Sequence, residues 1–289
     1  MDNSKLRSAQ LVMLKILDEV KRICEKNQIE YWLDSGTLLG AVRHKGFIPW
    51  DDDLDICMMR DDYNRFIEVC KDELDSKYFL QIYDTDKYTQ NPFLKIRDRN
   101  SILRMNEREK GHVGIFVDIF PMDPYDSKDN NNTNYKIKKS LNNKILFYWM
   151  KYAEIKKPFL KNLKGNLVKV MARTYFYIFH NYDYESLNIE AKKYVNKINM
   201  ENIKTSKYVG YGVEVPFEQI LKREDVFPLT TLEFEGKKYY TPGNFDGYLK
   251  EFYGDYMKLP DIEDRVPSHC IELKVKLTPE EYEKLNSRY

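Results

Sequence analysis

Apolar residues recur along this chain with two different periods, and the periods separate helices from strands. Between residues 6 and 27 they return every three or four positions, which predicts an amphipathic helix buried through Leu11, Leu14, Leu17, Val20 and Cys24. Short apolar runs bounded by turn residues predict strands at 31–33, 51–58, 78–83, 93–97, 101–105 and 114–121. Further helices are predicted at 37–42 and 61–70.

Polarity peaks at residues 129–134, which predicts a loop or linker, and helices are predicted to fill 135–200. Beyond Gly210 the pattern becomes mixed again: a hairpin is predicted over 230–241, with short helices at 248–253 and 279–285. We therefore expect an α+β fold, in which a mixed sheet with flanking helices carries a helical insertion.

One stretch combines strand-like alternation with acidic residues. Asp51, Asp53 and Asp55 occupy alternate positions beside Leu54 and Ile56. In an extended backbone alternate side chains share a face, so the three carboxylates would project together. Like charges this close repel unless a cation lies between them, and carboxylate oxygens suit Mg²⁺ or Mn²⁺. The pattern predicts a metal site, although acidic runs also occur as solvated loops.

A further acid, Asp118, lies inside the apolar strand 114–121. A charge in such a run is costly unless it is paired or bound to a metal. A third carboxylate on a neighbouring strand is what a two-metal site requires, so Asp118 is predicted to complete it and to accept a proton from an attacking hydroxyl. An ion pair with Arg97 or Arg99 is the alternative.

Clustered metal ions in such sites clamp phosphate oxygens, which indicates phosphoryl or nucleotidyl transfer on a phosphoanhydride. A glycine turn supplies backbone N–H groups for phosphate, and nearby cationic side chains supply charge. The predicted substrate contacts are Gly36, Thr37, Arg43, His44, Lys95 and Arg97. Alternatively, the arginine and lysine side chains form structural ion pairs, and His44 lies on the surface.

Residues 34–56, 93–98, 114–123 and 248–260 resemble the LicD/fukutin family of the nucleotidyltransferase superfamily. The resemblance implies a nucleotidyltransferase-like mixed sheet, with Asp53, Asp55 and Asp118 as catalytic residues. These three and Asp51 would hold two Mg²⁺ or Mn²⁺ ions. The polar stretch 129–134 divides the chain, and we predict a catalytic module over 1–128, a basic aromatic helical segment over 129–209 with no motif of the family, and a C-terminal part over 210–289 that completes the catalytic domain.

The family resemblance also implies a substrate class. Bacterial members transfer phosphocholine to cell-surface glycans, and animal members transfer ribitol phosphate from CDP-ribitol. The expected donor is CDP-choline or another CDP-alcohol, and the expected acceptor is a hydroxyl of a glycan, a lipid-linked glycan or a teichoic acid, with release of CMP. Choline, ribitol, glycerol and ethanolamine stay open. For choline, an aromatic cage would come from Trp50, Tyr125, Tyr248, Phe252 and Tyr253.

Two other function classes remain open from the residues. One is a true nucleotidyltransferase acting on a small molecule, and the other is a non-catalytic module that binds membrane or nucleic acid. Intact acids at the three catalytic positions argue against the second, and no nucleic acid partner is expected.

Charge is distributed unevenly in a chain whose net charge is only +1 over 289 residues. Residues 126–180 hold twelve Lys and Arg against three acids, a net +9, with aromatic residues between them. Such a segment, including Lys156, Lys157 and Lys161, suits an anionic glycan or membrane face, and a solvated basic helical surface is the alternative.

Localisation is predicted from three further features of the sequence. There is no apolar run of membrane-spanning length and no secretory apolar region at the amino terminus. The four cysteines lack metal-binding spacing, which favours free thiols. We expect a cytoplasmic protein, with possible peripheral contact to the inner membrane face.

Overall fold

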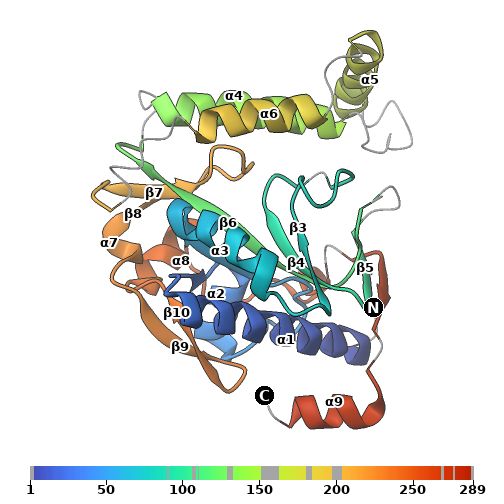
Figure 1. The fold of residues 1–289 in the computed structure, drawn as a ribbon, viewed down its shortest axis with the longest axis vertical. Helices are drawn as coiled ribbons and strands as arrows, with labels where there is room; N and C mark the ends of the chain where they lie inside the picture. Colours follow the sequence, from blue (N-terminus) through green and yellow to red (C-terminus); the bar gives the residue numbers. More distant parts are fainter. Residues whose placement is uncertain are drawn as a thin grey trace.

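The computed structural model describes residues 3–89, 91–105, 109, 111–128, 133–150, 163–179, 184–196, 204–267, 270–275 and 277–287 (Figure 1). Its helices are α1 (Asn3–Asn27), α2 (Ser35–His44), α3 (Arg60–Glu73), α4 (Thr133–Met150), α5 (Leu163–Ile178), α6 (Tyr184–Val195), α7 (Arg223–Val226), α8 (Phe245–Tyr253), the 3₁₀ turn η3 (Ile262–Asp264) and α9 (Pro279–Asn286). Its strands are β1 (Trp32–Leu33), β2 (Asp55–Met59), β3 (Tyr78–Gln81), β4 (Leu94–Asp98), β5 (Ile102–Arg104), β6 (Phe116–Tyr125), β7 (Tyr208–Tyr211), β8 (Ile220–Lys222), β9 (Thr230–Phe234), β10 (Lys237–Thr241) and β11 (Glu272–Lys274).

A seven-stranded mixed sheet forms the centre of the protein. Its main path runs β1-β2-β6-β4-β3, and β7 joins the distal half of β6 and pairs in turn with β8. Only β2 and β6 are parallel; the other ladders are antiparallel. With its flanking helices this confirms the predicted α+β class. The predicted hairpin is present as β9–β10, whereas β7, β8 and β11 had no predicted counterpart.

Strand β6 is buried along its whole length and contacts three other strands of the sheet. The sequence predicted that it would end at Pro121, but it continues to Tyr125. Residues 116–119 pair with β4 and residues 122–125 pair with β7, so Pro121 lies where the strand changes partner. A proline, which lacks an N–H, is tolerated at such a break in a ladder.

Helices α1 and α3 pack on the sheet through apolar stripes. The five residues predicted for the buried stripe of α1 are each at most 1% exposed. Helix α1 contacts β4 and β6, and α3 contacts β2 and β6 (Figure 1). The apolar core beneath these helices holds the central strands, and therefore their side chains, in fixed positions.

The strand predicted over residues 51–58 begins later than expected, at Asp55. The ladder with β6 begins at Asp55 and the ladder with β1 begins at Ile56. Before them only the Leu54 carbonyl bonds to a strand, accepting from the Asp118 N–H of β6, so residues 51–53 belong to no ladder. Burial nevertheless alternates through this stretch: Asp52 and Leu54 are buried, and Asp51 and Asp53 are half-buried. The prediction was wrong about the hydrogen-bonded strand, but the acids share a face as predicted.

Helices α4, α5 and α6 form the predicted helical insertion, at one end of the molecule (Figure 1). A small second core joins α4 and α6, made by Leu141, Ile145, Tyr148, Tyr184, Leu187 and Ala191. Lys138 anchors α4 to the sheet: its ammonium donates to the carbonyls of Tyr211, Gly212 and Val215 at 2.7–2.9 Å. Burial lowers the pKa of Lys138 to about 7. Residues 129–132 of the predicted loop lie outside the described residues.

A buried ion network joins α3, β6 and the segment after β7. The Arg60 guanidinium, 2% exposed, donates two hydrogen bonds to Asp123 and two to Glu214, at 2.7–2.9 Å. Charges removed from water are costly unless their partners are all present. The network therefore requires that the segments before and after the helical insertion pack together.

We predict that Arg60→Met lowers the free energy of unfolding by about 3–5 kcal/mol, because it leaves two buried carboxylates without their cation. Lys71→Met is the matched control, since Lys71 pairs with Glu68 on the surface of α3 and should cost no more than about 0.5 kcal/mol. Urea unfolding followed by circular dichroism measures both values. Equal stability of the two variants would show that the network contributes little.

Candidate active site

The sheet places two of the predicted acids side by side. Asp55 opens β2 and is the parallel partner of Asp118 on β6. The backbone of Asp55 is held on both sides, since its N–H donates to Thr37 Oγ1 at 2.9 Å and its carbonyl accepts from the Asp34 N–H at 3.0 Å. The Asp118 N–H donates to the Leu54 carbonyl at 2.9 Å. Strand register therefore brings together acids that lie 63 positions apart in the sequence.

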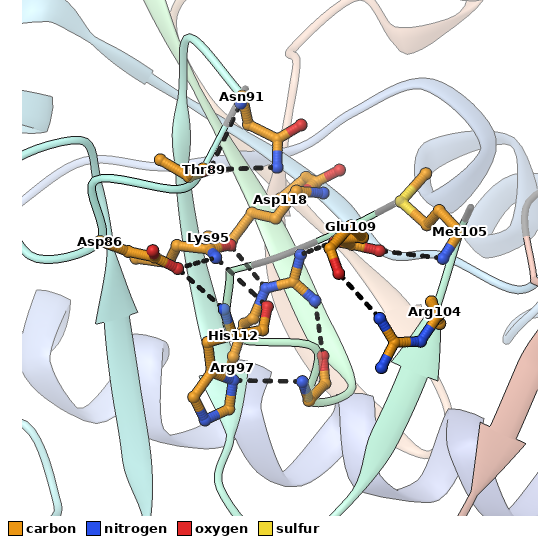
Figure 2. A network of polar contacts seen from close by, with 12 residues as sticks. Asp86, Thr89, Asn91, Lys95, Arg97, Arg104, Met105, Glu109, His112 and Asp118 are labelled. Atoms are coloured by element: carbon orange, nitrogen blue, oxygen red, sulfur yellow. Dashed lines mark hydrogen bonds and ion pairs between the residues drawn. The ribbon is translucent and has the colours of Figure 1, made fainter. Parts of the chain in front are cut away.

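A buried lysine faces Asp118 from the opposite strand. Lys95 on β4 is the antiparallel partner of Asp118, and its Nζ lies 2.5 Å from Asp118 Oδ1 (Figure 2). The lysine is 1% exposed, and its ammonium also lies 3.6 Å from the centre of the Phe116 ring. Burial lowers the pKa of Lys95, and the neighbouring Asp118 carboxylate opposes that shift. The contact brings one positive charge into the acid cluster.

Negative charge nevertheless dominates this cluster. Burial, followed by the charges of Asp53 and Asp118, raises the pKa of Asp55 well above its usual range. A set of carboxylates short of positive charge has the donor chemistry that Mg²⁺ or Mn²⁺ prefers. Among the described residues, however, no three acidic, histidine or cysteine side chains converge closely enough, as placed, to hold an ion. The carboxylates are therefore the right type of ligand for such a metal, but the described side chains are not arranged in its coordination geometry.

The amino-terminal end of α2 lies against Asp51. A Cβ added at Gly36 would come within 2.9 Å of Asp51 Oδ2, so only glycine lets the carboxylate approach this closely. Ser35 before it adopts a left-handed backbone with φ of 46°, a strained conformation that is concentrated at functional turns. The carboxylate of the N-cap residue Asp34 accepts no capping hydrogen bond from a backbone N–H of α2; it accepts instead from the Ser35 hydroxyl at 3.2 Å. The amino terminus of α2, an end of a helix that attracts anions, therefore lies next to Asp51.

Asp34 is a residue of this site that the sequence analysis did not single out. It is completely buried, and its two carboxylate oxygens accept hydrogen bonds of 2.6 Å from the hydroxyls of Tyr211 and Tyr248. Those tyrosines come from β7 and α8, beyond the helical insertion. The carboxylate therefore ties the C-terminal part of the chain to the turn that precedes Gly36. A signal was available in its position, directly after the apolar run Tyr31-Trp32-Leu33 and two residues before Gly36.

Comparison with known proteins places this chain in a family. Residues 28–164 match the model described as "LicD/FKTN/FKRP, nucleotidyltransferase domain", a range that contains all the predicted site residues. The lipopolysaccharide cholinephosphotransferase LicD of Haemophilus influenzae is 32% identical over 271 residues, which cover 92% of this chain and 97% of that protein. The chain belongs to the LicD family.

A more distant LicD-family relative shares a shorter region. Human ribitol 5-phosphate transferase FKRP is 28% identical over 115 residues, which cover 38% of this chain and 21% of that protein. An uncharacterised protein of Rickettsia typhi, RT0683, is 48% identical over 59 residues, 20% of this chain and 19% of that protein. The family resemblance expected from the sequence motifs is confirmed.

Arg97, predicted as a phosphate contact, has its guanidinium engaged elsewhere in this LicD-family chain. It lies two positions from Lys95 on β4 and is completely buried (Figure 2). Its nitrogens donate to Gln81 at 2.6 Å, to the Gly114 carbonyl at 2.8 Å and to Glu109 at 3.1 Å. The alternative that paired Asp118 with Arg97 or Arg99 is replaced by the pair with Lys95, and the bonds of Arg97 hold the segment before β6. Arg97 thus forms a structural ion pair, with Glu109, which was the alternative to a phosphate contact.

Arg43 and His44 lie at the carboxyl end of α2, on the side that faces Trp50. Arg43 donates to the Tyr256 carbonyl at 2.9 Å, and the ring of His44 meets Trp50 edge to face. Burial lowers the pKa of Arg43, while the charge of Asp51 opposes the shift. Burial also lowers the pKa of His44, which favours the neutral imidazole at neutral pH. Their contact with substrate stays a prediction.

Two of the predicted cage aromatics are unavailable to a ligand. Tyr125 and Tyr248 are at most 1% exposed, and both hydroxyls bond within the protein. Tyr253 is 44% exposed, and the half-buried ring of Phe252 stacks on Tyr248 at 5.1 Å. Burial of its hydroxyl, followed by the charges of Asp34 and Asp55, raises the pKa of Tyr253. Trp50 is half-buried beneath the Arg265 guanidinium, 5.5 Å from its ring.

A cavity of about 1150 Å³ opens elsewhere, at the carboxyl end of β2. Met59, Tyr31 and Tyr240 contribute to its walls, whereas none of the four predicted acids does. Asp55 lies at the opposite end of the same strand, so this cavity is separate from the acid cluster.

Asp55→Asn should raise the melting temperature in EDTA by about 2–4 °C at pH 8, and by almost nothing at pH 4. The raised pKa of Asp55 means that the folded state resists its ionisation. The unfolded chain ionises the group near pH 4, so the cost to the wild-type protein grows as the pH rises from that value toward the folded-state pKa. Differential scanning fluorimetry across this range measures the difference.

The matched control is Asp72→Asn, an exposed acid on α3, which should track the wild-type protein at every pH. A loss of stability in Asp55→Asn that is as large at pH 8 as at pH 4 would argue against charge repulsion in the cluster.

Proposed function

We propose that this protein transfers an alcohol phosphate, with phosphocholine as the first candidate, from a CDP-alcohol to a hydroxyl of a cell-surface glycan, and releases CMP. The proposal rests most directly on the pairing of Asp55 with Asp118 beside the amino-terminal end of α2. It is further supported by the similarity to LicD, a lipopolysaccharide cholinephosphotransferase, and to FKRP, a ribitol 5-phosphate transferase.

Different residues would bind the metal ions and the phosphates of the donor. Asp51, Asp53, Asp55 and Asp118 would hold the divalent ions. Bound Mg²⁺ or Mn²⁺ would neutralise the diphosphate and stabilise the departing CMP. The first N–H groups of α2 would contribute to binding the diphosphate, because a helix amino terminus attracts anions. Lys95, which pairs with Asp118, would add a positive charge for the same phosphates.

Proton transfer from the acceptor falls to a carboxylate of the cluster. Attack by a glycan hydroxyl on the distal phosphorus requires that its proton move to a base within hydrogen-bond reach. Asp118 is our candidate for this role, because its carboxylate lies in the cluster as the strand partner of both Asp55 and Lys95. The buried Asp34, held by two tyrosines, acts at a distance by positioning the turn that carries Gly36.

The decisive measurement is release of CMP from CDP-choline, CDP-ribitol, CDP-glycerol and CDP-ethanolamine with Mg²⁺ and a glycan acceptor. Asp55→Asn and Asp118→Asn should each reduce the rate by at least about 10²-fold, because charge stabilisation in the transition state is lost. Asp72→Asn should retain the wild-type rate. Wild-type turnover by Asp55→Asn at saturating Mg²⁺ would overturn the assignment.

The same assay tests the alternative activities. Release of pyrophosphate from ATP or CTP, with no CMP from any CDP-alcohol, would identify a nucleotidyltransferase. Absence of turnover with every donor, together with no thermal stabilisation by donor and Mg²⁺, would favour a non-catalytic binding module.

For a choline donor we predict that Tyr253→Ala raises KM for CDP-choline about tenfold, because a quaternary ammonium is attracted by an aromatic face. The KM for CDP-ribitol should change far less, since ribitol carries no positive charge. Tyr88→Ala, which removes an exposed ring away from α8, is the control. An equal change in KM for both donors would show that Tyr253 does not distinguish their head groups.

A further inference from the structure

Helix α5 turns an apolar face outward. At 100° per residue, Leu163, Leu167, Val170, Met171 and Ile178 fall on one side of the helix, and each is 38–65% exposed. The opposite side carries Ala172, which is buried. A surface helix of a soluble protein ordinarily shows the reverse, with its apolar side toward the core. An exposed apolar patch of this kind marks an interaction site.

The position of α5 leaves this face accessible. The helix lies beyond α4 and α6 at one end of the molecule, away from the central sheet (Figure 1). Its contact with α4 includes the rings of Tyr175 and Phe147, whose centres are 5.6 Å apart. Nothing in the described part of the chain covers the Leu167 and Met171 side chains, which are 47% and 65% exposed.

Charge around the patch indicates its partner. Helices α4 and α5 contain no Asp or Glu, and α5 carries Lys164, Lys169 and Arg173. Tyr177 and Phe179 are exposed at the carboxyl end of α5, where aromatic rings suit the boundary between lipid head groups and acyl chains. Apolar, aromatic and basic side chains without acids are the composition of helices that lie in an anionic bilayer surface.

We propose that α5 docks this protein on bilayers containing anionic lipids, with its apolar face in the head-group region. No helix in the described ranges has the length and apolar character to cross a membrane, so the contact would be peripheral. A second copy of the chain is a poorer occupant, because two α5 helices would bring like charges together with no acid on α4 or α5 to pair with them. The contact is independent of the proposed activity.

The sequence predicted an anionic partner for residues 126–180 as a whole. The present proposal assigns the contact to helix α5 alone. Lys156, Lys157 and Lys161, which that prediction included, lie outside the described residues. Lys164 is the described basic residue nearest in sequence to them, and it is exposed beside the apolar face.

The test is co-sedimentation of the full chain with vesicles of phosphatidylcholine alone or with phosphatidylglycerol added. Wild-type protein should bind the mixed vesicles, and more weakly as salt rises. The double variant Leu167→Glu, Met171→Glu should bind about tenfold less or worse, because two apolar side chains no longer enter the interface. Both sites are exposed, so the fold should tolerate the change, which its melting temperature checks. Lys164→Glu should weaken binding mainly at low salt.

Ile189→Glu is the matched control, since Ile189 is 48% exposed on α6, and it should bind as the wild-type protein does. Absence of wild-type binding to anionic vesicles at low salt would overturn the proposal. So would a wild-type dimer in light scattering that the double variant converts to monomer without any vesicle binding. Hydrolysis of CDP-choline by water should be equal in the wild type and the double variant; its absence in both would count against the proposed function and leave the vesicle result intact.

Discussion

The parallel register of β2 and β6 forces two carboxylates together, and much of the surrounding structure serves to make that arrangement stable. Asp55 and Asp118 repel each other in a site that excludes much of the solvent, and the raised pKa of Asp55 reflects this repulsion. Lys95 brings one compensating charge from β4. The remaining imbalance would favour binding of a cation, so the same repulsion that costs stability would support the proposed chemistry.

Segments distant in sequence are needed to hold these acids. The hydroxyls of Tyr211 and Tyr248 fix Asp34, and Arg60 joins Asp123 to Glu214 across the region where β7 leaves the sheet. All of these groups are buried, so each is costly if its partner is absent. The helical insertion interrupts the chain between the two halves of this arrangement, and the sheet brings them together again through β6 and β7.

The insertion has a different physical character from the sheet that carries the acids. Its core of described residues is small, and α5 exposes apolar side chains together with Lys164. A bilayer contact at this end would leave the acid cluster unchanged.

Local pattern determined a good part of this protein. The buried stripe of α1, the hairpin β9–β10 and the alternation from Asp51 to Ile56 follow from side-chain period alone, since that period decides which face meets the core. The motif around Gly36 was long enough to indicate the family. Tertiary structure decided the rest. It ended the ladder between β2 and β6 at Asp55, and it extended β6 past Pro121 because β7 supplies a new partner. It bound Arg97 to Gln81, Gly114 and Glu109, and made Asp34 a clamp for two tyrosines. These outcomes depend on contacts between residues far apart in the chain, which a local pattern does not encode.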